Sequence, residues 1–311
     1  MITDDEEFEG FDDGEGETAL DRIRAMLMAE KAADAPFDLA LERQRAEERG
    51  AGAPLPEGWS ATPYDIGRPA ALLSGPGAKD TRTILHLFGG GYCIGTLASR
   101  MGLAAALAKA SEARSLLLEY RLAPEYPFPA AFDDALAAYR RVLADGVAPE
   151  SLVLMGESAG AGLALAVAVA AKSQGLPMPL AIVAICPWTD LTQSGESMTY
   201  RADQDPSISK ARLDGHAARY LAGADPRDPR ASPLFGDLAG LPQLLIHVGG
   251  DEVLLSDAER FVEAARAVGV DATVEIWPGL FHVWHRYYAQ MEEAAEGVSE
   301  IGAWLKRRWK T

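Results

Sequence analysis

The sequence predicts an α/β fold, with a mostly parallel central sheet flanked by helices and a small helical cap. Three observations predict this fold class. Short continuous apolar runs alternate with helix-like stretches, glycine-rich turns follow several of these runs, and one more polar segment interrupts the alternation. With 311 residues, 48% of them hydrophobic, the chain can bury one substantial core with insertions.

Two different segments precede the predicted core. Residues 1–17 are acidic and glycine-rich, a composition that cannot bury enough apolar surface to pack, so we expect a flexible leader. Within residues 18–50, apolar positions recur with helical spacing on both sides of Pro36, which predicts two short cap helices broken near this proline.

Residues 51–311 form the predicted core domain. Apolar runs of four to six residues without alternation are typical of strands that are covered on both faces. Helix-like stretches between them provide the crossovers that a parallel sheet requires. The predicted strands are 83–88, 115–120, 152–155, 181–185, 244–248 and 273–277, and the helices between them include 102–110, 131–143, 161–172 and 258–268.

One internal segment breaks this rhythm. Between about 192 and 228, polar turns at Asp205-Pro206 and Asp225-Pro226 flank a helix-like stretch over 210–221. We expect this segment to be a cap insertion in the core domain.

The charge excludes some partners. The 29 basic and 46 acidic residues give a net charge of −17, which repels nucleic acids and anionic membranes. Cys93 and Cys186 lie in hydrophobic segments, so no disulfide framework is expected, and the acidic N-terminus does not resemble a signal peptide. No apolar run is long enough to span a bilayer. We expect a soluble cytoplasmic protein without a nucleic-acid or membrane partner.

Ser158 is the candidate nucleophile. It is the centre of the pentapeptide 156–160 (Gly-Glu-Ser-Ala-Gly), which follows the predicted strand 152–155 and precedes the helix-like stretch 161–172. A sharp strand-to-helix turn needs small residues at its two ends, and it exposes the serine beside a helix N-terminus. The alternative is a glycine-rich turn with an inert serine.

A second glycine-rich turn, Gly89-Gly90-Gly91, follows the first strong strand. Backbone N–H groups that stabilise an oxyanion must approach it closely, which favours residues without side chains. A dinucleotide-binding loop fails on spacing, because its last glycine is replaced by Ile94. The alternatives are an oxyanion hole and a plain loop.

The serine needs a base, and five histidines are available. His86 and His247 lie in predicted strands and His216 in the cap helix. His282 and His285 follow the last strand, and we favour His282, which is nearer to the turn, with His285 at a helix surface or pocket rim. A metal site at this pair is not predicted, because no further ligand with suitable spacing accompanies it.

An acid must orient the base, and Asp251 follows a strand through two glycines. Ser158, Asp251 and His282 then occur in the chain order of a strand-supported nucleophile, acid and base. Asp251 could instead cap the following helix, and Asp190 and Asp257 are rival acids.

Taken together, these motifs resemble those of the bacterial hormone-sensitive-lipase-like (family IV) carboxylesterases, a branch of the α/β-hydrolase superfamily. The resemblance covers about residues 85 to 284. It rests on the loop 88–92, the stretch 120–130, the pentapeptide 156–160 and the motifs 187–191, 251–254 and 282–284.

The resemblance implies the α/β-hydrolase fold with an N-terminal cap, no cofactor, and dimerisation through the sheet edge. Two positions depart from the family pattern: Phe88 replaces the histidine that usually precedes the three glycines, and Glu157 stands where aspartate is more common. His86 should point to the same strand face as position 88 but cannot occupy its place. The implied site residues are the catalytic Ser158, Asp251 and His282 and the oxyanion-hole amides of Gly90, Gly91 and Ala159.

We therefore expect a serine carboxylesterase that hydrolyses short- to medium-chain esters of small molecules through an acyl-enzyme. A lactone or amide hydrolase with the same triad, or a non-catalytic ligand-binding protein on this scaffold, are the alternatives. A compact apolar substrate pocket is predicted from the aromatic neighbours of the motifs, Tyr92, Trp188, Phe281 and Trp284.

Overall fold

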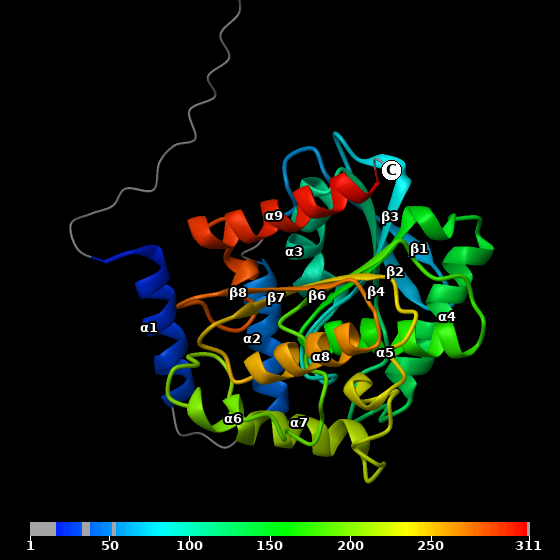
Figure 1. Ribbon diagram of the computed structural model, residues 1–311. Coiled ribbons are helices and arrows are strands. Elements are labelled where there is room, and N and C mark those ends of the chain that lie inside the picture. Colours follow the sequence, from blue (N-terminus) through cyan, green and yellow to red (C-terminus); the bar gives the residue numbers. More distant parts are fainter. Residues whose placement is uncertain (1–16, 33–37, 52–53, 310–311) are drawn as a thin grey trace, which may run out of the picture.

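The structure is a computed structural model that describes residues 17–32, 38–51 and 54–309. Its centre is one eight-stranded sheet with the order β1-β2-β4-β3-β5-β6-β7-β8 (Figure 1). All strands from β4 onward in this order run parallel, which confirms the predicted fold class. The strands are β1 (Ser60–Asp65), β2 (Pro69–Ser74), β3 (Lys79–Leu87), β4 (Ala113–Leu118), β5 (Leu152–Glu157), β6 (Ala181–Ile185), β7 (Gln243–Gly249) and β8 (Ala272–Trp277).

The hairpin of β1 and β2 was not among the predicted strands. The two strands pair antiparallel with each other, and β2 pairs antiparallel with β4. Five of the six residues of β1 are exposed, and only Tyr64 is partly buried. An edge strand of this kind lacks the continuous apolar run that reveals a strand covered on both faces.

Helices cover both faces of the sheet (Figure 1). On one face lie α3 (Leu97–Ala110) and α9 (Glu292–Arg308), and on the other lie α4 (Ala130–Ala144), α5 (Ala159–Ser173) and α8 (Leu255–Ala267). Small residues let these layers approach closely. A Cβ on Gly302 of α9, for example, would lie 2.4 Å from the carbonyl oxygen of Ala110 in α3.

Four helices form a cap beside the core. They are α1 (Ala19–Ala32) and α2 (Leu39–Ala51) before the first strand, and α6 (Ser197–Tyr200) and α7 (Lys210–Leu221) within the segment after β6. The expected leader, apart from Glu17, and the expected break at Pro36 lie outside the described residues.

Ion pairs and hydrogen bonds attach the cap to the core. Arg43 of α2 forms a bidentate pair with Glu125, with both contacts at 2.7 Å, and also donates to the carbonyl oxygens of Cys93 and Ala123. The two parts of the cap are joined by an ion pair between Arg212 of α7 and Glu42 of α2. The cap is therefore fixed above the loops that follow β3 and β4.

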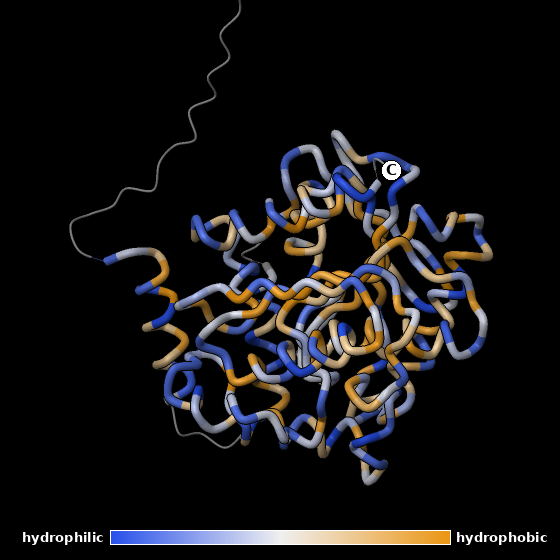
Figure 2. Tube along the Cα trace, viewed as in Figure 1, coloured by the Kyte–Doolittle hydropathy of each residue, from blue (hydrophilic) through white to orange (hydrophobic). Residues whose placement is uncertain are grey.

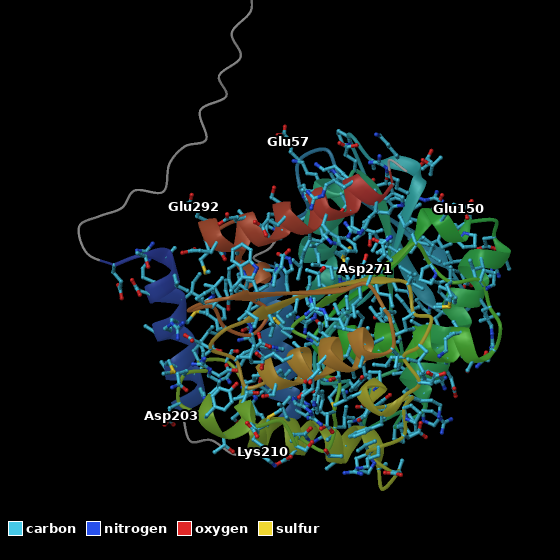
Figure 3. All side chains as sticks on the ribbon, viewed as in Figure 1. Glu57, Glu150, Asp203, Lys210, Asp271 and Glu292 are labelled. Carbon is cyan, nitrogen blue, oxygen red and sulfur yellow. The ribbon has the colours of Figure 1, made fainter. Side chains whose placement is uncertain are left out.

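Polarity follows the layers. Hydrophobic residues gather along the sheet and the inner sides of its helices, whereas hydrophilic residues lie outside (Figure 2). The acidic side chains of Glu57, Glu150 and Glu292 extend from the periphery (Figure 3). Among the described residues, no helix is both long and apolar enough to cross a membrane. Short 3-10 turns complete the connections, at η1 (Pro149–Ser151), η2 (Pro233–Phe235) and η3 (Trp284–Tyr287).

Candidate active site

Ser158 lies in the sharp turn between β5 and α5. Its φ of 56° and ψ of −124° belong to a region that non-glycine residues rarely occupy. The turn requires glycine on both sides, because a Cβ on Gly156 would lie 2.4 Å from the carbonyl oxygen of Gly160. A Cβ on Gly160 would lie 2.0 Å from the carbonyl oxygen of Leu87. This turn places the serine at the carboxyl edge of the sheet, beside the N-terminus of α5.

The glycine loop after β3 passes directly beside this serine. A Cβ on Gly89 would lie 3.0 Å from the Cβ of Ser158. Gly90 and Gly91 have φ angles of 136° and 59°, which side-chain-bearing residues rarely adopt. Their N–H groups donate to no other group in the described part of the chain. The N–H of Ala159 belongs to the first turn of α5, where N–H groups have no intrahelical acceptor. These amides can serve as oxyanion donors.

The loop is held by a buried carboxylate. Glu157 accepts a hydrogen bond from the N–H of Gly89 at 2.7 Å, and its other oxygen lies 2.8 Å from Nε2 of His86. Burial opposes ionisation of Glu157, but His86 and the Gly89 amide bring its pKa below the ordinary value. The departure at position 157 thus has a structural role: Glu157 anchors the loop, and His86 of β3 contacts the same carboxylate.

Phe88 takes part in the same support. Its ring stacks on Tyr120 with the ring centroids 4.5 Å apart, and the Tyr120 hydroxyl donates to its carbonyl oxygen at 2.6 Å. The residue that replaces the usual histidine is therefore fully buried and fixed by an aromatic neighbour.

His282 contacts the serine directly. Its Nε2 lies 2.8 Å from Oγ of Ser158, which is hydrogen-bonding distance for proton transfer. The loop after β8 brings the ring to this place, with Val283 in the left-handed region at φ 52°. The structure therefore brings together the predicted nucleophile and the predicted base.

The acid beside His282 is Glu252, not the predicted Asp251. Oε1 of Glu252 lies 3.2 Å from Nδ1 of His282, and its Oε2 accepts from the N–H of Gly249 at 3.0 Å. The carboxylate is completely buried. In the turn after β7, successive side chains point in different directions, and it is the second acid that faces the base.

Asp251 instead faces the cap. Its carboxylate forms an ion pair with Arg24 of α1 at 2.9 Å, and Arg201 lies 4.0 Å away. It is not a helix cap either, because α8 begins at Leu255 with Leu254 as the capping residue.

The rival acids Asp190 and Asp257 both have partners other than His282. Asp190 pairs with Arg260 at 3.0 Å, and Asp257 accepts from the N–H of Thr189 at 2.8 Å. Neither carboxylate is hydrogen-bonded to His282.

A cavity of about 430 Å³ opens above the serine and is closed from the other side by the cap. Ser158, His282 and the glycine loop form its floor. Apolar side chains of the cap, such as Leu27 and Leu213, line part of the opposite wall.

The four aromatic residues predicted for the pocket do not line this cavity. They are almost completely buried and pack into the protein core, because large apolar rings beside strand ends gain more from neighbours below the loops than from the open cavity. Tyr92 stacks on Tyr220, Trp188 donates to Gln193, Phe281 packs edge-on against Tyr287, and Trp284 lies between Trp277, His247 and His285.

His216 was assigned only to the cap helix, yet it lines the cavity. A Cβ on Gly91 would lie 2.6 to 2.8 Å from atoms of its ring. Burial, with help from the positive charges of Arg212 and Arg219, lowers the pKa of His216 to about 4, so the ring is neutral at pH 7. No motif marks this residue, because it reaches the site only through the folding of the cap insertion.

His285 is also placed differently from the expectation of a surface or rim residue. It is completely buried, and its Nε2 lies 3.2 Å from Nδ1 of His247. Burial and the neighbouring His247 lower its pKa well below the ordinary value. It therefore belongs to the core beneath α9.

Among the described residues, two groups of side chains have the donor types of a metal site. One consists of Cys186, Glu252 and His282, whose ligand atoms lie within 4.8 Å of one another. Burial, and then the adjacent Glu252, raises the pKa of the Cys186 thiol well above its ordinary value, so it lacks the thiolate that binds metals. The other group consists of His247 of β7, Glu275 of β8 and Glu300 of α9, none of which lines the cavity that contains Ser158.

A family model with an α/β-hydrolase fold matches residues 84–286, well over half of the chain. The chain belongs to the α/β-hydrolase family. An acetyl-hydrolase of Streptomyces hygroscopicus is 45% identical over 262 residues, covering 84% of this chain and 87% of that protein. An esterase of Acinetobacter venetianus is 34% identical, covering 72% of this chain and 74% of its own length.

Solved structures show which α/β-hydrolases this chain resembles in fold and sequence. A crystal structure of an esterase from the bacterial hormone-sensitive lipase family has a TM-score of 0.90 and 41% identity, over 94% of this chain and 98% of that chain. The esterase EstE5, soaked with p-nitrophenyl butyrate, also has a TM-score of 0.90, with 39% identity over 95% of this chain and 100% of its own. The resemblance inferred from the motifs is thus confirmed.

Proposed function

We propose that this carboxylic ester hydrolase cleaves short- to medium-chain esters through an acyl-enzyme formed on Ser158. The observation that carries the proposal is the contact of 2.8 Å between Oγ of Ser158 and Nε2 of His282, with Glu252 on the other ring nitrogen. A serine hydroxyl is a weak nucleophile until such a base takes its proton.

In the first half of the reaction, Ser158 attacks the ester carbonyl carbon while His282 accepts the hydroxyl proton. The buried Glu252 carboxylate holds Nδ1 of the ring and stabilises the imidazolium that forms. His282 then gives the proton to the departing alcohol. In the second half, His282 activates a water molecule that releases the acid and restores the serine.

Both halves of the reaction form an oxyanion, and the glycine loop is proposed to stabilise it by hydrogen bonds. The amides of Gly90, Gly91 and Ala159 are the proposed donors, since the loop and the start of α5 flank the serine. Preorganised donors of this kind contribute about 10²–10³-fold each to the rate.

The cavity supports a limited chain length. A space of about 430 Å³ beneath α1, α2 and α7 is in the range of small-molecule sites. We expect p-nitrophenyl acetate and butyrate to be turned over with a higher kcat/KM than the long-chain esters of the same alcohol.

The test is Ser158→Ala together with a fluorophosphonate probe. The substitution should abolish turnover of p-nitrophenyl butyrate, and the probe should label the folded wild-type protein at Ser158. Turnover that survives the substitution would overturn the assignment. A folded wild type without adduct or turnover would favour the ligand-binding alternative. Faster hydrolysis of a lactone or an anilide than of linear esters would reassign the substrate class.

We also propose that the protein works in the cytoplasm as a homodimer joined at the β8 edge. Both described cysteines are buried and unpaired, as suits a reducing compartment. β8 is the terminal strand of the sheet, and its Ile276 side chain is exposed. Light scattering measures the mass of the wild type and of Ile276→Glu, and we expect a dimer for the former and a monomer for the latter. A monomeric wild type would contradict the dimer.

A further inference from the structure

Two arginines in the catalytic cavity lack a hydrogen-bond partner among the described residues. Arg100 of α3 and Arg286 of η3 both line the cavity that contains Ser158 and His282. Neither guanidinium forms a hydrogen bond or an ion pair with any described residue; for Arg100, the Nε is moreover shielded from solvent. Both side chains are partly buried. Guanidinium groups that are removed from water are normally paired, because the loss of hydration is costly.

The other two arginines of this cavity have ion-pair partners. Arg49 forms an ion pair with Glu30 at 2.8 Å, and Arg212 pairs with Glu42. The remaining carboxylates, Glu48 and Glu157, contact Gln44 and His86, each at 2.8 Å. Glu157 is near enough to favour the charge of Arg100, but in the described part of the chain neither Arg100 nor Arg286 donates a hydrogen bond to a carboxylate of the cavity wall.

Arg100 lies close to the reacting centre. Its Nη2 would be 3.3 Å from a Cβ built on Gly90, so the guanidinium rests against the proposed oxyanion loop. Burial, and after it the positive charge of Arg286, lowers the pKa of Arg100 to about 10, so it stays protonated at pH 7. Arg100 and Arg286 line the same cavity, where their like charges repel each other. A bound anion would relieve this repulsion.

We propose that the physiological substrate is an ester that carries a carboxylate, and that this carboxylate binds between Arg100 and Arg286 while the ester carbonyl lies at Ser158. The inference rests on the proposed esterase function and names the class of its substrate. Guanidinium groups match carboxylates with two parallel charge-assisted hydrogen bonds. A neutral ester would leave both guanidinium groups without a carboxylate partner.

The test compares two pairs of substrates that differ in one charge. Mono-4-nitrophenyl glutarate and its methyl ester place the charge on the acyl side. 4-Acetoxybenzoate and its methyl ester place it on the alcohol side. The readout is the ratio of kcat/KM for the anionic ester to that for its neutral partner, which cancels effects on the triad.

In Arg286→Gln, this ratio should fall about tenfold or more for at least one pair, since a charge-assisted hydrogen bond is lost. The pair that responds shows which side of the ester the cations bind. Arg286→Lys should restore part of the ratio. Free glutarate should inhibit the wild type competitively and the Arg286→Gln variant more weakly.

Arg227→Gln is the matched control, because it removes the same charge from an exposed position outside the cavity. Its ratios should equal those of the wild type. Equal ratios in the wild type and Arg286→Gln for both pairs would overturn the proposal. Failure of the esterase function itself would look different, since neither the neutral nor the anionic esters would then be hydrolysed and Ser158 would not be labelled.

Discussion

At the scale of single residues, the site depends on which of two adjacent acids faces the base. Glu252 lies at Nδ1 of His282, whereas Asp251 pairs with Arg24 of the cap. The two side chains differ in their contacts because successive residues in a tight turn point in different directions.

The pair Glu252→Gln and Asp251→Asn tests this assignment. We expect Glu252→Gln to lower kcat by about 10²- to 10⁴-fold with a small change in KM, because the ring loses the charge that orients and stabilises it. Asp251→Asn, the matched control, should keep kcat within about threefold, since the carboxylate only contacts the cap and such pairs contribute little. Steady-state kinetics on p-nitrophenyl butyrate measures both, and the opposite order would restore Asp251.

The buried Glu157 gives a pH-dependent prediction. Its pKa is below the ordinary value of 4.5, so its ionised form stabilises the folded state. Such a group contributes stability above its unfolded pKa and loses it as the pH falls through the folded pKa. Glu157→Gln should therefore lower the unfolding midpoint in urea most at neutral pH, and the gap to the wild type should shrink as the pH falls below 4.5. A gap that does not change with pH would contradict this origin.

At the scale of elements, two helices can cross closely only where a glycine at the contact carries no side chain. α3 and α9 pack on one face of the sheet, and Gly302 lies at their contact with Ala110. Helix α9 contains two glycines, Gly297 and Gly302. Replacing each by alanine changes helix propensity in the same way, so a difference in stability between the two variants reports the contact between α3 and α9.

Gly302→Ala should destabilise the protein by about 1–3 kcal/mol, because its Cβ would meet backbone atoms of Ala110 that cannot move away. Gly297→Ala is the control in the same helix. Its nearest neighbours are side-chain atoms of His285 at 3.2 Å, and the gain in helix propensity partly offsets the tighter contact. Chemical denaturation should rank Gly302→Ala as clearly less stable than Gly297→Ala, and equal effects would refute the backbone contact.

The contacts of Arg43 attach helix α2 to the core. Arg43 reaches across to Glu125 and to two loop carbonyls, whereas Arg45 pairs with Glu42 inside the same helix. Arg43→Gln should increase hydrogen exchange over 39–51, while Arg45→Gln, with the same change of charge, should leave it near the wild-type level. Mass spectrometry of peptides from this region measures both, and equal protection would show that other contacts hold the cap.

At the scale of the whole molecule, the parallel core and the positions of its six parallel strands along the chain were predictable from the sequence. Strands covered on both faces consist of continuous apolar runs, and the elbow at Ser158 has a spacing that few other structures require. The edge hairpin was not predictable in this way, because β1 has no buried face to mark it.

The missing parts of the site have a common cause. The direction of Glu252, the position of His216 and the convergence of Arg100 with Arg286 arise when distant segments meet. No local pattern encodes such meetings. The predicted aromatic pocket failed for the same reason, since nearness to a motif along the chain does not decide on which side of a loop a ring packs.

The place of the cap in the chain has a consequence for how this enzyme could diversify. α1 and α2 precede every strand of the sheet, so they can be exchanged without interrupting the connections of the core. Their contacts with the core include a small number of ion pairs whose core partners, Asp251 and Glu125, lie on loops. Grafting the first fifty residues of a relative onto this chain would thus be a compact route to new ester preferences, with the proton-transfer machinery inherited intact.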